Sequence, residues 1–136
     1  MLDNLPVLLQ RAVSGRITPL AFSRRWGSIS EEIELRCQSL QREFDCLYAQ
    51  VSGRTRRAQV EKTLKGVYRK EADCLHSLLS CMNKWIAGRG GSAYLRMARE
   101  SLDLAEELWR RRIKALVDLS DRLDISWSFP SAFKKA

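Results

Sequence analysis

The chain has 136 residues, a formal net charge of +8, 45% hydrophobic residues and 29% charged residues. This composition is too apolar for a disordered chain and fits one folded globular domain. No apolar run approaches the roughly 18 residues that cross a bilayer. Asp3 stands where a signal peptide would carry Lys or Arg. We therefore expect one soluble cytoplasmic domain, residues 1–136, that does not contact a membrane.

Residues 1–27 predict a short helical hairpin. The first helix runs over about 4–13, where leucines recur at helical spacing. Thr18 is a suitable N-cap for the second helix, because Pro19 follows it at the first helical position. This second helix is expected to end near Gly27.

Residues 28–124 predict a core of three longer helices. Ser28 can cap the first of them, which continues as far as Val51. The second runs over about 55–87 and the third over about 92–124, with a glycine-rich turn between them. Each of these two helices would be about 45–50 Å long, and the short turn makes them antiparallel neighbours. The predicted fold class is all-α: a small helical bundle in which a short N-terminal hairpin joins three longer antiparallel helices.

Apolar faces on the three longer helices are expected to form most of the core. The last helix has a broad apolar face that includes Trp109 and Ile113. Glu71 falls on the apolar seam of the middle helix and indicates a polar contact or a slight shift of face. The first long helix has a heptad-like seam that consists of Ile29, Ile33, Cys37, Leu40, Phe44, Leu47 and Val51.

Residues 125–136 predict an extended aromatic tail. Ile125, Trp127 and Phe129 alternate with serines, and this period of two is typical of an extended segment. The aromatic side chains either pack against the bundle or bind another subunit or a partner, since clustered exposed aromatics mark interfaces. On the second alternative, the candidate partner-binding residues are Trp127, Phe129 and Phe133.

Most of the positive charge lies in one stretch of the chain. Residues 52–72 carry seven basic side chains against two acidic ones, and a second basic run occupies residues 110–114. An antiparallel pair of helices would bring these two clusters to the same end of the bundle. The candidate nucleic-acid-binding residues are Arg54, Arg56, Arg57, Lys62, Lys65, Arg69, Lys70, Arg110, Arg111, Arg112 and Lys114.

A concentrated basic surface attracts polyanions, and phosphate contacts give affinity without sequence specificity. Arginine outnumbers lysine 17 to 7, and its planar guanidinium suits phosphate. We therefore expect a non-enzymatic accessory subunit that binds RNA or DNA through the phosphate backbone, within a larger nucleoprotein assembly. The alternative is a helical protein-interaction module, such as a chaperone, an immunity-type inhibitor or a scaffold, that binds an acidic protein or another copy of itself.

No residue pattern predicts catalysis or a cofactor. The four cysteines form no CxxC pair. His76 lies two residues from Cys74, a spacing that points the two side chains in different directions on a helix. The glycine-rich turn before Ser92 lacks the GK[ST] sequence of nucleotide-binding loops. We expect no catalytic residue, metal, cofactor or small-molecule substrate.

Overall fold

A computed structural model describes residues 4–89 and 91–129, and within them the chain forms helices and no strand. The helices are α1 (Leu5–Val13), α2 (Pro19–Ala49), α3 (Arg54–Ile86) and α4 (Ser92–Leu123). The prediction of an all-α helical bundle is therefore confirmed. Over the same residues, no helix combines the length and the apolarity needed to cross a membrane.

The helix end predicted near Gly27 is wrong, because α2 passes through this residue without a break. Thr18 is the N-cap of α2, as predicted, but Ser28 caps nothing, and its hydroxyl donates to the carbonyl of Arg25. The buried apolar line that crosses this point consists of Phe22, Trp26, Ile29 and Ile33. Burial of this line outweighs the roughly 1 kcal/mol that one glycine costs inside a helix. Residues 4–89 and 91–129 therefore form one short helix followed by three long ones.

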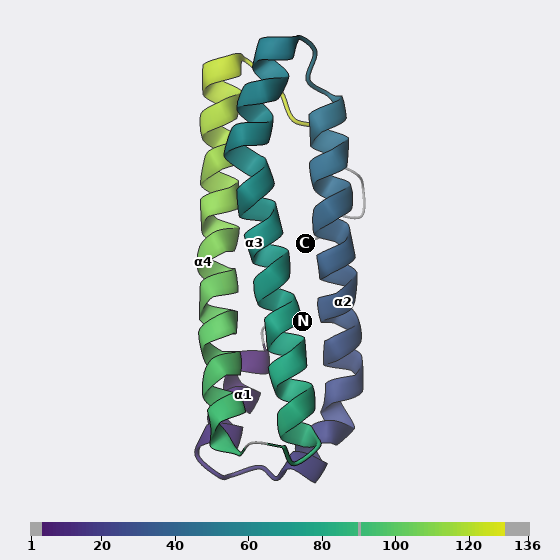
Figure 1. Cartoon of the computed structure of the whole chain (residues 1–136), viewed down its shortest axis with the longest axis vertical. Coiled ribbons are helices and arrows are strands. Elements are labelled where there is room, and N and C mark those ends of the chain that lie inside the picture. Colours follow the sequence, from purple (N-terminus) through teal and green to yellow (C-terminus); the bar gives the residue numbers. More distant parts are fainter. Residues whose placement is uncertain (1–3, 90, 130–136) are drawn as a thin grey trace.

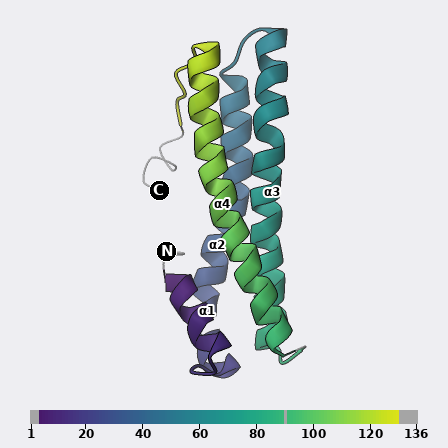
Figure 2. The ribbon, with the colours of Figure 1, turned by 90° about the vertical axis from the view of Figure 1, so that its left-hand side faces the viewer.

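The three long helices lie side by side along most of their length (Figure 1). Between α3 and α4, Arg56 contacts Leu123 and Ser77 contacts Ser101, so later residues of α3 meet earlier residues of α4. The backbone of α2 packs against α3, and that of α3 packs against α4. The short α1 packs against α2 and α4 at the end of the bundle where α2 begins (Figure 2).

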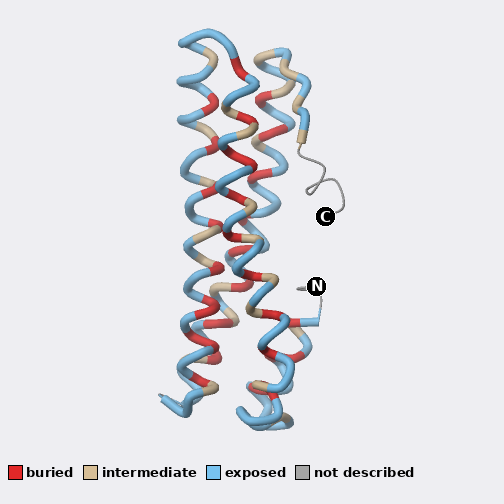
Figure 3. Tube along the Cα trace, turned by 90° about the vertical axis from the view of Figure 1, so that its right-hand side faces the viewer, coloured by how far each residue is buried: buried red, intermediate tan, exposed pale blue. Residues whose placement is uncertain are grey.

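Buried residues follow the inward sides of the helices (Figure 3). Every residue of the predicted α2 seam, from Ile29 to Val51, is buried. Near the start of α2, Phe22 packs edge-on against Trp85 with ring centroids 5.4 Å apart. The apolar face predicted for α4 is too broad, because Trp109 is 44% exposed and Ile113 is 42% exposed.

After α4, residues 125–129 form an extended segment that folds back against the bundle (Figure 2). Trp127 and Phe129 are half-buried and pack against the core. The indole N–H of Trp127 donates to the carbonyl of Leu116 at 2.9 Å. Of the predicted partner-binding residues, these two therefore contact their own bundle, because packing there removes aromatic surface from water. The third, Phe133, lies outside the described residues.

Candidate nucleic-acid interface

The first half of α3 presents its basic side chains to solvent. Of the seven predicted there, only Arg56 is half-buried. The inward face of the same stretch is formed by Leu64 and Tyr68, which are buried. The exposed side chains are those of Arg54, Arg57, Lys62, Lys65, Arg69 and Lys70.

Two of the seven basic residues predicted in the first half of α3, Arg56 and Arg57, stabilise the fold. Arg56 donates from its guanidinium to the carbonyl of Leu123, the last residue of α4. Arg57 donates to the carbonyl of Val51 at 2.7 Å, and its guanidinium lies 5.1 Å from the ring centroid of Tyr48. The Leu123 carbonyl ends a helix and the Val51 carbonyl lies in the loop between α2 and α3, so both lack a helical partner and would otherwise need water. The donors of the two arginines are only partly available to a ligand.

The basic run of α4 is divided between the surface and the core. Arg110, Arg111 and Lys114 are exposed, and Arg111 pairs with Glu107 at 2.7 Å. Successive residues of an α-helix point about 100° apart, and Arg112 points inward, where it is 6% exposed. The prediction that Arg112 binds nucleic acid is wrong, because its guanidinium is enclosed within the bundle.

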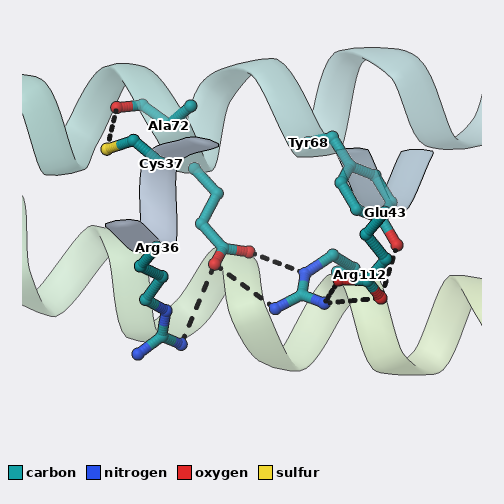
Figure 4. A network of polar contacts seen from close by, with 7 residues as sticks. Arg36, Cys37, Glu43, Tyr68, Ala72 and Arg112 are labelled. Carbon is teal, nitrogen blue, oxygen red and sulfur yellow. Dashed lines mark hydrogen bonds and ion pairs between the residues drawn. The ribbon is translucent and has the colours of Figure 1, made fainter. Parts of the chain in front are cut away.

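Arg112 lies at the centre of a buried polar network that joins the three long helices (Figure 4). Its Nε and Nη2 atoms donate to the two carboxylate oxygens of Glu71 in α3, at 2.9 and 3.4 Å. Its Nη1 atom donates to Glu43 in α2 at 3.2 Å. The Tyr68 hydroxyl donates to Glu43 at 3.1 Å, and Arg36 approaches Glu71 to 3.9 Å. Buried charges persist only when they are paired in this way.

The charges within this network oppose the cost of their burial. Burial acts to lower the pKa of Arg112, but the hydrogen bond and charge of Glu71 and the charge of Glu43 raise it above its ordinary value. Burial raises the pKa of Glu43, against the opposing charge of Arg112. Burial and the charge of Glu43 also raise the pKa of Tyr68. These shifts keep Arg112 protonated and make Tyr68 a hydrogen-bond donor to Glu43.

Burial disfavours the thiolate form of two cysteines, Cys37 and Cys74. Burial, followed by the charges of Glu34 and Glu71, raises the pKa of the Cys37 thiol to about 11. Burial also raises the pKa of Cys74. Raised thiol pKa values reduce the thiolate that would act as nucleophile or ligand. Residues 4–89 and 91–129 contain no group of three or more side chains placed to hold a metal ion.

The contacts between α3 and α4 place their exposed basic side chains at neighbouring levels. Arg56 meets Leu123 and Glu71 meets Arg112, so the first half of α3 lies beside the second half of α4. Of the exposed cations predicted to bind nucleic acid, Lys65 pairs with Glu61, Arg111 pairs with Glu107 and Arg57 donates to Val51, whereas the other six have no carboxylate within 4.0 Å and no side-chain hydrogen bond among the described residues. These six, called the outer cations below, are Arg54, Lys62, Arg69, Lys70, Arg110 and Lys114.

One exposed side chain beside these cations was missed from the sequence. The spacing of the buried α4 residues predicts that Trp109 lies in the core. Two sequence signals point the other way. Trp109 directly precedes the basic run, and Ile113 and Val117 follow it at intervals of four residues, which places all three on one side of α4.

Together these features define a helical bundle with exposed basic side chains on two neighbouring helices. A buried ion network is the main polar feature of its described interior. No family model, curated protein or solved structure matches the chain.

Proposed function

We propose that the chain is a non-enzymatic accessory subunit that binds nucleic acid in the cytoplasm, within a larger nucleoprotein assembly. The outer cations of α3 and α4 contact the phosphate backbone. The observation that carries this proposal is that six of the predicted cations are exposed and have neither a carboxylate partner nor a side-chain hydrogen bond among the described residues. The contacts that bring the first half of α3 beside the second half of α4 support the placement of the outer cations of both helices at one end of the bundle.

The spread of these charges favours a polyanion over a small anion. Arg54 and Lys70 are separated by about 24 Å along α3, since each residue adds 1.5 Å to a helix. A single phosphate or carboxylate reaches only one end of such a surface. A nucleic acid presents many phosphates in succession and releases counterions as each cation is neutralised. Contacts of this kind give affinity without reading base edges.

Fluorescence anisotropy with labelled RNA and DNA at 50 and 200 mM salt tests this proposal. We expect binding that weakens steeply with salt. Replacing Lys62, Arg69 and Lys70 with Gln should lower the slope of log affinity against log salt by roughly 2–3. Arg112 is left intact, because its loss would disturb the core. The matched control is Arg24→Gln with Arg25→Gln, which removes exposed charges where α2 begins.

Three outcomes would overturn the proposal. They are absence of binding at 50 mM salt, an affinity that the triple variant does not change, and an equal loss in the control variant. Tighter binding to polyglutamate than to either nucleic acid would instead identify the chain as a helical protein-interaction module with an acidic partner.

A further inference from the structure

Three large apolar side chains are exposed in a row on α4. Trp109, Ile113 and Val117 are 44%, 42% and 55% exposed, and their spacing of four residues places them along one side of the helix. We call this row the α4 stripe. Exposed apolar residues are common singly, but a contiguous row that includes a tryptophan marks a binding surface.

The stripe lies between two covered parts of α4. Towards the start of the helix, Leu95 and Leu102 are buried at the end of the bundle where α1 packs. Towards its end, Trp127 bonds the carbonyl of Leu116. In the described residues, the Trp127 indole N–H has this acceptor. The ring of Trp109 instead remains 44% exposed and presents apolar surface to solvent.

Cations directly flank the stripe. Arg110 follows Trp109 and Lys114 follows Ile113, and both are outer cations. The acidic side chains closest along the helix are Glu106, one turn before Arg110, and Asp118, one turn after Lys114, and neither forms an ion pair with them in the described residues. An aromatic ring beside unpaired cations fits a ligand that is both flat and anionic. A nucleotide has this combination, with a base for the ring and a phosphate for the cation.

We propose that the α4 stripe binds single-stranded nucleic acid, with a base stacked on Trp109 and the adjoining phosphates on Arg110 and Lys114. This inference rests on the proposed function and deepens it. Every base has a π-face, so stacking on an aromatic side chain is tolerant of sequence. In a duplex the bases stack on one another, so their faces are not available to the ring of Trp109. The stripe thus gives preference for single strands, and the cations of α3 do not.

The test compares three ligands on the full chain: a labelled single-stranded oligothymidylate, a duplex of equal length, and heparin, a polyanion without bases. Trp109→Ala should weaken single-strand binding about tenfold. It should leave duplex and heparin binding unchanged, because these ligands use only the cations. Trp109→Phe retains a ring and should retain most of the affinity. The control is Leu35→Ala, which removes an equally exposed apolar side chain from α2.

Tryptophan fluorescence gives a second measurement on the same proteins. Oligothymidylate should quench the wild-type signal, and heparin should not. If the wild type binds all three ligands and Trp109→Ala binds oligothymidylate equally well, stacking is refuted while the proposed function stands. If the wild type binds none of them, both fail. Light scattering that shows an oligomer dissociated by Trp109→Ala would assign the stripe to contact between copies and overturn the inference.

Discussion

Arg112 of α4 and Glu71 of α3 are joined inside the bundle by two hydrogen bonds, of 2.9 and 3.4 Å, and each side chain is withdrawn from solvent. The same guanidinium reaches Glu43 of α2. A buried ion pair adds little net stability compared with apolar packing, but it penalises any alignment that separates its members. One arginine therefore favours a single alignment of the three helices, because their other contacts are made by apolar side chains that pack with less specificity.

Replacing Arg112 with Met should destabilise the protein by about 3–5 kcal/mol. The substitution leaves two buried carboxylates, Glu43 and Glu71, without their cation. Urea unfolding followed by circular dichroism measures the free-energy change. A loss below about 1 kcal/mol would contradict the pairing described here.

A combined variant separates the loss of pairing from the loss of packing. Adding Glu43→Met, Glu71→Met and Tyr68→Phe to Arg112→Met removes the stranded charges and the Tyr68 donor together. We expect this variant to recover most of the lost stability, because apolar side chains of similar volume replace buried ion pairs at little cost. Its helices should then be aligned less uniquely, which broadened NMR side-chain signals would report.

Glu43 should make the stability of the folded protein depend on pH, and the direction of its pKa shift sets the sign of this dependence. Burial raises the pKa of Glu43 in the folded state above the ordinary carboxyl value of about 4.3. The folded state then binds this proton more tightly than the unfolded state, so the contribution of Glu43 to stability falls as pH rises between the two pKa values. Glu43→Gln mimics the protonated form. It should be at least as stable as the wild type at pH 7.

The difference between Glu43→Gln and the wild type should shrink as the pH is lowered towards 4. Urea unfolding of both proteins at several pH values measures it. Greater stability of the wild type at pH 7, with a margin that grows as pH rises, would show that pairing with Arg112 outweighs burial at Glu43.

Gly27→Ala should stabilise the protein by about 0.5–1 kcal/mol. Gly27 lies inside α2, and apart from its chain neighbours and the backbone of its own helix, no atom lies within 4 Å of the position that a Cβ would take. The matched control is Gly53→Ala, since Gly53 has a φ of +94° that favours glycine. Thermal unfolding should show a higher midpoint for the first variant and a lower one for the second. A lower midpoint for Gly27→Ala would refute the continuous helix.

Much of the helical core could be predicted from the sequence because it depends on local periodicity. The seam from Ile29 to Val51 follows that periodicity and is buried throughout. The continuity at Gly27 could not be predicted from one glycine, because packing on α3 outweighs its helix propensity. The predictions for Arg112 and Trp109 are wrong for a different reason: Arg112 is buried and Trp109 is exposed, the reverse of what the sequence pattern predicts. Their exposure depends on which helix lies opposite, and a sequence pattern on one helix does not contain that information.

The interior contacts of Cys37 predict slow reaction with alkylating reagents. Its Sγ atom contacts the carbonyl of Ala72 at 3.8 Å, and its pKa is raised to about 11. At pH 8 only about one thiol in a thousand would be ionised, and the thiolate is the reactive form. Cys46 is half-buried and should be modified first by iodoacetamide, with mass spectrometry locating the label. Equal rates at the two cysteines would contradict the burial of Cys37.

The aromatic segment after α4 should contribute stability within a single chain. Trp127→Ala removes half-buried ring surface and the 2.9 Å bond to the Leu116 carbonyl, and it should cost about 1–3 kcal/mol. Trp127→Phe keeps most of the packing and should cost about 1 kcal/mol, because only the hydrogen bond is lost. Gln50→Ala is the companion variant, since the Gln50 amide accepts from and donates to the backbone of Ser128 at 2.8 and 2.5 Å. If these variants leave the unfolding free energy unchanged but alter the mass measured by light scattering, the segment binds another copy instead of its own bundle.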